Sequence, residues 1–89
     1  MQFAHQPDYA FHPGETLAEA LDELGMTVSN LARKSGLSRD WLEGLIGGSN
    51  AVNLTAASLL EKAIGIPAGF WMRSQANFDH HSARVAVKP

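Results

Sequence analysis

Glycines divide most of this chain into segments about the length of one short helix, and this spacing limits its possible folds more than any other feature. They stand at Gly25, Gly36, Gly47-Gly48 and Gly65. Between them, apolar residues recur every three or four positions, as they do on the buried side of a helix. Helices this short are not stable alone in water and must pack on one another. The sequence therefore predicts an all-α fold.

Residues that can cap a helix precede three of these segments, at Thr27, Ser38 and Asn53. A side-chain oxygen in such a position accepts a hydrogen bond from a free backbone N–H of the first turn. With the glycines as C-terminal stops, we expect five helices, over about 14–24, 28–35, 39–46, 54–64 and 67–78. After them, residues 84–87 alternate like a short strand.

The size and composition of the chain exclude several classes of protein. Its 89 residues give room for one domain, and with 45% apolar and 18% charged residues it should fold. The absence of cysteine excludes a disulfide framework and a thiolate zinc site. No apolar run reaches the roughly 20 residues that a membrane span needs, and residues 1–25 hold no Lys or Arg for the start of a signal peptide. We expect a cytoplasmic protein without a membrane partner.

The window of residues 28–47 has the pattern of a helix-turn-helix unit. Such a unit needs a small residue where its two helices touch, a glycine in the turn, and apolar residues that hold the second helix on the first. Ala32 and Gly36 meet the first two needs, and Leu42 and Leu45 meet the third. Because the second helix of such a unit enters the major groove of DNA, the window predicts a DNA-binding protein.

Two phrases outside this window carry a resemblance to a known family. The first is His12-Pro13-Gly14-Glu15, ahead of the leucine-bearing first helix. The second is Phe70-Trp71 followed by Gln75-Ala76-Asn77-Phe78-Asp79. With the helix-turn-helix pattern between these phrases, the chain from His12 to about Asp79 resembles the HigA/VapI-type antitoxins of the XRE (lambda-repressor-like) regulators.

The resemblance implies a five-helix lambda-repressor-like DNA-binding domain with a short C-terminal tail, which acts as a homodimer. It also implies that the protein represses its own promoter and neutralises a small HigB/RelE-like ribonuclease toxin. We accordingly divide the chain into an N-terminal extension at residues 1–13, a helix-turn-helix domain at 14–79 and a C-terminal tail at 80–89.

In this architecture the first residues of the second helix face base edges, while their neighbours contact the phosphate backbone. Arg39 can contact a guanine bidentately, and Asp40 or Glu43 can accept a hydrogen bond from a cytosine amino group. A two-fold dimer would bind a palindromic operator. The residues expected at the double-stranded DNA are Ser29, Asn30, Arg33, Lys34, Ser38, Arg39, Asp40, Glu43, Ser49 and Asn50.

Several residues depart from the family pattern and leave alternatives open. The carboxylates of Asp40 and Glu43 are repelled by phosphates, and Ser49-Asn50 stand where the family often has a basic pair. One alternative is therefore a helix-turn-helix protein-interaction module with weak or lost DNA binding, and another is an XRE regulator without a toxin partner. Trp41 could pack under the second helix, contact a thymine methyl or belong to a protein interface.

Aromatic residues of the last predicted helix are expected in the core and at a dimer interface rather than around a cofactor. These are Phe70, Trp71 and Phe78. Charge indicates a second surface, because residues 1–25 have a net charge of −5 and the rest of the chain +3. The acidic side of the first helix could meet a small basic toxin protein.

Neither a metal centre nor catalytic chemistry is expected. His5, His12, His80 and His81 include no pair at the four-residue spacing that builds zinc sites on a helix. No nucleophile has a base at a recognisable spacing, and no glycine-rich loop has the phosphate-binding pattern. We therefore expect a binding protein without a cofactor, and not an enzyme.

Overall fold

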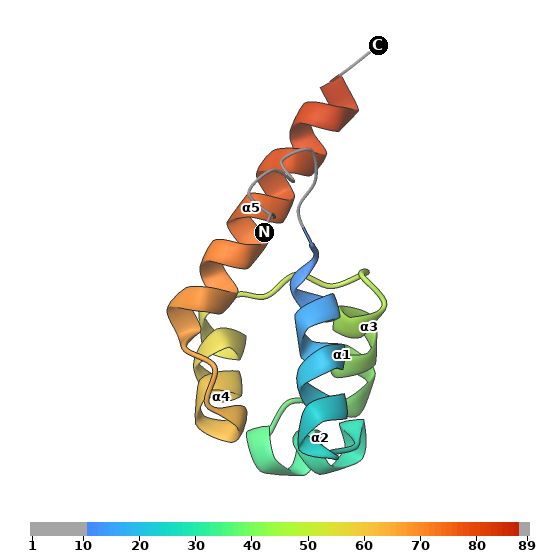
Figure 1. Cartoon of the computed structure of the whole chain (residues 1–89), viewed down its shortest axis with the longest axis vertical. Helices are drawn as coiled ribbons and strands as arrows, with labels where there is room; N and C mark the ends of the chain where they lie inside the picture. Colours follow the sequence, from blue (N-terminus) through green and yellow to red (C-terminus); the bar gives the residue numbers. More distant parts are fainter. Residues whose placement is uncertain (1–10, 88–89) are drawn as a thin grey trace.

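The structure is a computed structural model that describes residues 11–87, with side chains described for residues 11–81. Five helices make up this part of the chain (Figure 1): α1 (Pro13–Leu24), α2 (Val28–Ser35), α3 (Arg39–Ile46), α4 (Leu54–Ile64) and α5 (Ala68–Val87). Helix α3 packs on α1 and α2, α4 packs on α2 and α5, and α5 also contacts α1. The expected all-α, five-helix fold is confirmed.

Helices α2, α3 and α4 begin and end where the sequence predicts. The side-chain oxygens of Thr27, Ser38 and Asn53 each accept a hydrogen bond, over 2.8–3.0 Å, from the backbone N–H of the third residue after them. Gly36 follows α2 with a φ of 84°, in the left-handed region that favours glycine. The turn between α2 and α3 therefore forms where the helix-turn-helix pattern places it.

An apolar core lies between the helices. Its largest fully buried side chains come from all five of them: Leu17, Leu31, Leu42, Leu45, Leu60 and Trp71. The Trp71 indole N–H donates to the Ile66 carbonyl oxygen over 3.1 Å, so the polar atom of this buried ring is paired. Burial of each such side chain is worth about 1.5–3 kcal/mol, which holds together helices that are too short to be stable alone.

The two phrases that carry the family resemblance meet in space, although they stand near opposite ends of the chain. His12 is buried and caps α1, because its Nδ1 accepts a hydrogen bond from the Gly14 N–H over 2.9 Å. The same ring meets the Phe78 ring edge-on, with centroids 4.8 Å apart. Gly14 lies against α3, where a Cβ would collide with the Leu45 carbonyl. These contacts join the start of α1 to α3 and α5.

A buried glutamine joins α5 to the loop that precedes α4. Gln75 Oε1 accepts a hydrogen bond from the Val52 N–H over 2.9 Å. Its Nε2 donates to the Asp79 carboxylate, also over 2.9 Å. Both ends of the buried amide are thus paired, and the loop between α3 and α4 is held on α5.

Helix α5 is longer than predicted, because it continues past Phe78 to Val87. The expectation of a short strand at residues 84–87 is wrong, since this segment is helical. Alternation over four residues is too short to identify a strand, and neither glycine nor proline interrupts the chain between Gly69 and Pro89. The C-terminal part of α5 extends beyond the other helices (Figure 1), and the predicted boundary at residues 79–80 falls within this helix.

Residues 1–10 and 88–89 lie outside the described part of the chain. With them lie most of the predicted N-terminal extension, including His5, and the end of the predicted tail. No helix within residues 11–87 combines the length and the hydropathy that a membrane span requires.

Candidate nucleic-acid interface

Helices α2 and α3 form the expected helix-turn-helix unit. Leu42 and Leu45 bury one side of α3 in the core, and Ala32 of α2 packs against the same core. The opposite side of α3 is exposed, and its first two turns present polar residues to solvent. These residues are Arg39, Asp40 and Glu43. We call this exposed side the polar face of α3.

The one basic side chain of the polar face is paired within the helix. Arg39 Nε donates to Glu43 Oε2 over 3.1 Å, one helical turn away. Both side chains remain largely in solvent, with 63% of the Arg39 surface and 50% of the Glu43 surface exposed. A pair of this kind is worth only about 0.3–0.5 kcal/mol, so it orients Arg39 without preventing another contact. With Asp40 included, α3 has a net charge of −1.

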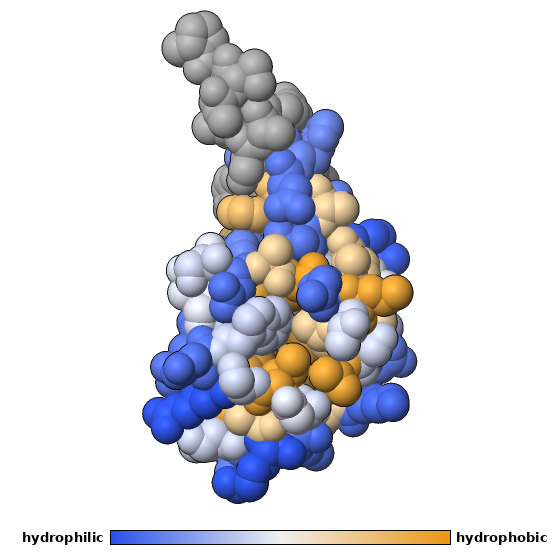
Figure 2. Space-filling view, turned by 180° about the vertical axis from the view of Figure 1, so that it is seen from behind, coloured by the Kyte–Doolittle hydropathy of each residue, from blue (hydrophilic) through white to orange (hydrophobic). Residues whose placement is uncertain are grey.

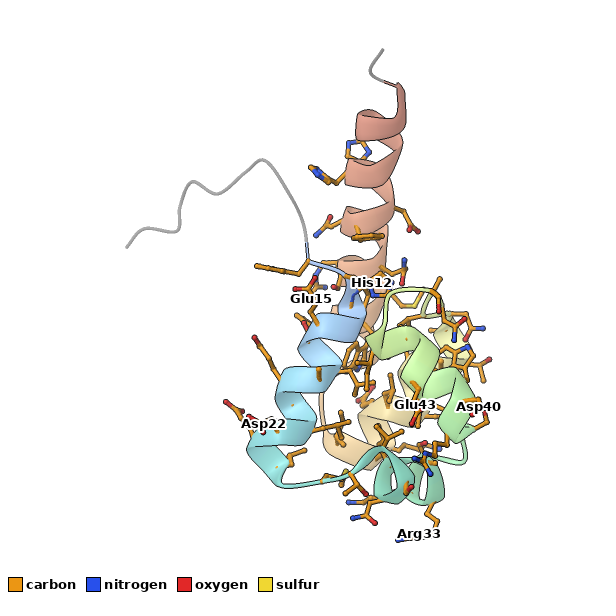
Figure 3. All side chains as sticks on the ribbon, turned by 90° about the vertical axis from the view of Figure 1, so that its right-hand side faces the viewer. His12, Glu15, Asp22, Arg33, Asp40 and Glu43 are labelled. Atoms are coloured by element: carbon orange, nitrogen blue, oxygen red, sulfur yellow. The ribbon has the colours of Figure 1, made fainter. Side chains whose placement is uncertain are left out.

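The other basic residues of the unit lie in the last turn of α2. Arg33 Nη2 donates to Asn30 Oδ1 over 2.8 Å, and Lys34 is exposed beside it. Figure 3 shows Arg33 at the lower end of the molecule, whereas Asp40 and Glu43 lie higher, along α3. Ser29, at the start of α2, is half-buried. Arg33 therefore lies to one side of the polar face and not among its carboxylates.

The loop after α3 folds back onto that helix and uses two of the side chains that were expected at phosphates. The Ser49 hydroxyl donates to the Gly44 carbonyl oxygen over 3.1 Å, and the Asn50 amide donates to the Trp41 carbonyl oxygen over 2.9 Å. The loop lies so close that a Cβ at Gly44 would collide with the Asn50 amide. Ser49 and Asn50 therefore have a structural role, at the end of α3, that the sequence pattern did not predict.

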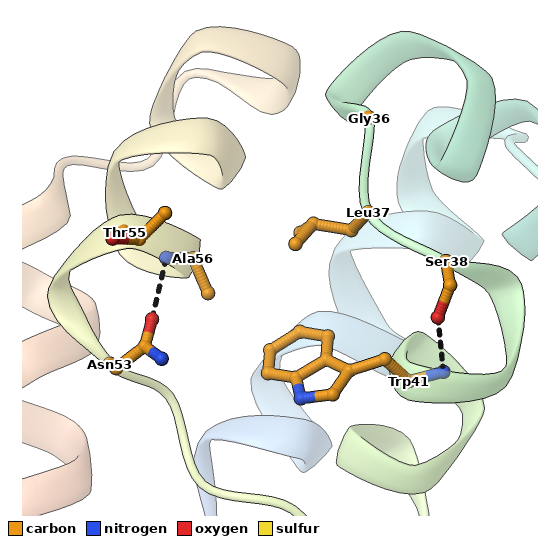
Figure 4. A pocket seen from close by; sticks show the side chains of 7 residues that line it. All are labelled: Gly36, Leu37, Ser38, Trp41, Asn53, Thr55 and Ala56. Atoms are coloured by element: carbon orange, nitrogen blue, oxygen red, sulfur yellow. Dashed lines mark hydrogen bonds between the residues drawn. The ribbon is translucent and has the colours of Figure 1, made fainter.

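Trp41 turns from α3 toward α4 and lines an open groove with a volume of about 300 Å³ (Figure 4). The other lining residues are Gly36, Leu37, Ser38, Asn53, Thr55 and Ala56. The indole is half-buried and packs against the core. Of the three roles considered for Trp41, packing beneath α3 is the one that the structure shows.

Apolar surface lies near the helix-turn-helix unit. Figure 2 shows hydrophobic residues gathered across the middle of the face opposite that of Figure 1, with hydrophilic side chains around its lower margin. Leu54, at the start of α4, is 64% exposed, and its sequence neighbours Asn53 and Thr55 line the groove. Apolar surface is therefore exposed at the start of α4, next to residues that line the groove.

The three aromatic residues expected at a dimer interface differ in accessibility. Trp71 is 0% exposed within a single chain, so it cannot touch a second copy and serves the core. Phe70 and Phe78 are half-buried on α5 and keep accessible surface. Only these two remain available for a contact between chains.

Three side chains hold this arrangement in place by contacts that the sequence did not predict. Besides His12 and Gln75, Glu61 contributes, because its Oε1 accepts a hydrogen bond from the Ala68 N–H at the start of α5 over 2.9 Å. The proline that follows His12 is a signal for a helix start. Gln75 and Glu61 carried no such signal, since their partners belong to other segments. Among the described residues, no three potential metal-ligating side chains come together.

The chain matches solved structures of antidote proteins, although no protein-family model and no curated protein matches it. A protein described as an antidote of a plasmid maintenance system, from Nostoc punctiforme, matches with a TM-score of 0.83 and 29% identity, over 88% of this chain and 86% of that chain. An addiction-module antidote protein of the HigA family, from Coxiella burnetii, matches with a TM-score of 0.80 and 29% identity, over 84% and 83%.

A third match is to a structure that contains DNA. The Pseudomonas aeruginosa antitoxin HigA with the higBA promoter gives a TM-score of 0.81 and 27% identity, over 85% of this chain and 84% of that chain. All three are described as antidote or antitoxin proteins, in agreement with the expectation of a non-enzymatic binding protein. The similarity covers far more than the helix-turn-helix unit. By fold and by these matches, the chain is a five-helix helix-turn-helix protein similar to the HigA-type antitoxins.

Proposed function

We propose that the chain is an antitoxin-type transcriptional repressor, which binds its own operator as a dimer and neutralises a HigB/RelE-like ribonuclease toxin. The placement of α3 is the observation that carries this proposal. Leu42 and Leu45 anchor α3 in the core, and Arg39 and Asp40 are exposed at its start, where a helix-turn-helix protein contacts bases. The similar HigA that was solved with its promoter supports the same use of this unit.

In the proposed complex, α3 lies in the major groove and neighbouring polar residues contact phosphates. Ser38, Arg39, Asp40 and Glu43, which are all exposed, face base edges. Ser29, Asn30, Arg33 and Lys34 contact the DNA phosphates. Ser49 and Asn50 contact phosphates through the polar groups that their hydrogen bonds to α3 leave free. A repressor of this kind acts in the cytoplasm, where its operator DNA is located. With few basic groups beside two carboxylates, each protomer binds modestly and in a salt-dependent way.

The proposed dimer forms through α5. This helix extends beyond the other four (Figure 1), and the half-buried Phe70 and Phe78 keep accessible apolar surface on it. In a dimer with a two-fold axis at this contact, both protomers make the same DNA contacts, so the number of contacts doubles. Two α3 helices related in this way bind two half-sites of a palindromic operator, one helical turn apart.

The proposed toxin-binding surface is the acidic side of α1. Glu15, Glu19, Asp22 and Glu23 are all exposed, and α1 contains no basic residue. A ribonuclease needs basic surface to bind RNA, so charge complementarity favours this pairing.

Co-purification with the product of the adjacent gene tests the toxin partner. The combined change Glu19→Gln and Asp22→Asn should weaken the association, whereas Asp40→Asn, on a different helix, should not. If no small basic protein is encoded next to this gene, the result would favour a helix-turn-helix regulator without a toxin partner over an antitoxin.

A second candidate function is a protein-interaction module that no longer binds an operator. Three observations favour it: Arg39 is paired with Glu43, and the side chains of Ser49 and Asn50 bond within the chain. Apolar surface near Leu54 would suit a protein partner.

Titration of the DNA upstream of the gene, at about 50 and 200 mM salt, separates the two functions. Repression predicts binding that weakens steeply with salt, because phosphate contacts release counterions. Arg39→Ala and Arg33→Ala should each weaken binding, and Arg33→Ala, which removes a phosphate contact, should reduce the logarithmic salt slope by roughly 1. Lys62→Ala, which removes an exposed cation from α4, is the matched control and should leave the slope unchanged. No binding at low salt would favour the protein-interaction module.

A further inference from the structure

We infer that Glu43 is a positioning residue for Arg39: its carboxylate holds the guanidinium by Nε, so that the two terminal nitrogens are presented to one guanine of the operator. The inference rests on the proposed operator binding and deepens it, because it assigns a base to the first residue of α3. It also gives the carboxylate of Glu43 a role other than direct base contact.

The atoms that pair decide what Arg39 can still bind. A guanidinium carries five N–H donors in a planar fork, one on Nε and four on the terminal nitrogens. Glu43 Oε2 accepts from the Nε donor over 3.1 Å. Within the described part of the chain, Arg39 has no other hydrogen bond or ion pair. The end of the fork therefore remains free for the bidentate contact that guanine offers through O6 and N7.

The position of the pair on α3 fits this role. Arg39 is the first residue of the helix, directly after the Ser38 cap, and the first residues of such a helix approach base edges. Glu43 lies one turn further along the same side, behind Arg39 as seen from the start of the helix. Arg39 is also the more exposed of the two, at 63% against 50%. The carboxylate thus supports the arginine from within the helix and leaves its tip in solvent.

Holding the side chain in advance favours binding, because fewer rotamers are lost when the contact forms. Each rotamer-rich side chain ordered in this way is worth about 2- to 12-fold in affinity. The benefit applies only where the presented nitrogens find two acceptors in the right geometry. Glu43 should therefore increase discrimination for guanine more than it increases overall DNA affinity, which its negative charge lowers.

Two other roles for Glu43 make different predictions. If Glu43 accepts a hydrogen bond from a cytosine amino group itself, it sets the preference at a second base pair, independently of Arg39. If the ion pair keeps Arg39 away from DNA, removing the carboxylate strengthens the guanine preference.

The test compares base preferences of the full-length chain and its variants, using a pool of random DNA duplexes as the probe. Arg39→Ala identifies the base pair that Arg39 contacts, as the one whose guanine preference falls by roughly 5- to 150-fold. Glu43→Leu, which leaves no acceptor for the Arg39 Nε hydrogen, should lower the preference at that same base pair by about 2- to 12-fold. In the Arg39→Ala background, Glu43→Leu should change it no further, because Glu43 acts through Arg39.

Asp40→Asn is the matched control, since it removes one carboxylate from the same helix without touching the Arg39 pair. Both Asp40→Asn and Glu43→Leu should strengthen overall binding by reducing repulsion from phosphates. Only Glu43→Leu should weaken the guanine preference at the Arg39 base pair. Equal helical content and thermal stability of the variants would show that α3 remains folded.

Three results would overturn the inference: an unchanged guanine preference in Glu43→Leu, a stronger one, or a loss at a different base pair that persists without Arg39. In each of these cases the wild-type chain still binds DNA, and the proposed operator binding stands. If the wild-type chain binds no duplex at low salt, the operator proposal and the inference fail together.

Discussion

At the scale of single residues, two glycines allow close contacts around α3: Gly14 lies against backbone, and Gly44 lies against a side-chain amide. A Cβ on Gly14 would collide with the Leu45 carbonyl, and a Cβ on Gly44 would collide with the Asn50 amide. Both glycines lie within helices, where glycine costs about 1 kcal/mol relative to alanine. The close approach of another segment, and not helix propensity, therefore explains glycine at both positions.

Gly14→Ala should lower the free energy of unfolding by about 1–3 kcal/mol, because α1 must move away from α3. Urea denaturation measures this change. Gly69→Ala is the matched control in α5, where a Cβ would meet only the end of the Arg73 side chain at 3.8 Å. The control should be neutral or gain up to about 1 kcal/mol from helix propensity. Equal stability of the two variants would contradict the packing of α1 on α3.

The candidate site could be predicted only where its residues are close in sequence. Arg39 and Asp40 are exposed as predicted, because the apolar period of α3 determines which side is buried. The Arg39–Glu43 pair has the spacing of neighbours on a helix surface. The Asn50 bond to the Trp41 carbonyl depends on the path of a loop, which has no period from which it could be inferred.

At the scale of elements, α2, α3 and α4 could be predicted because each has a capping residue before it and a glycine after it. The end of α5 could not be predicted, since no glycine follows its last turn. The contacts of α5 were also not predictable. They depend on Gln75, whose amide pairs with the backbone of Val52 in a different segment.

Gln75→Leu should lower the free energy of unfolding by about 1–3 kcal/mol, because the Val52 N–H loses its acceptor while buried. Thermal denaturation followed by circular dichroism measures the loss. Asn77→Ala, at an exposed position of the same helix, should stay within about 0.5 kcal/mol of the wild type. A Gln75→Leu variant as stable as this control would mean that the loop before α4 is not held by α5.

At the scale of the whole molecule, three surfaces have separate proposed roles: the polar face of α3 for DNA, the acidic side of α1 for a toxin, and α5 for a second copy. The dimer can be tested without DNA or toxin. Sedimentation should show a dimer for the wild-type chain, and Phe70→Lys should raise its dissociation constant at least roughly tenfold by placing a charge in the contact. Ala76→Lys, on a different side of α5, should leave the dimer intact. A monomeric wild-type chain, or a Phe70→Lys variant that remains dimeric, would exclude the proposed contact.

The central claim is that the first turns of α3 enter the major groove of the operator. Chemical-shift mapping of the backbone amides, as the upstream duplex is added at low salt, tests this claim most directly. We predict the largest shifts at residues 38–44, smaller shifts in α2, and little change on the acidic side of α1. Largest shifts in α1 or α4, or no shifts at all, would contradict the account.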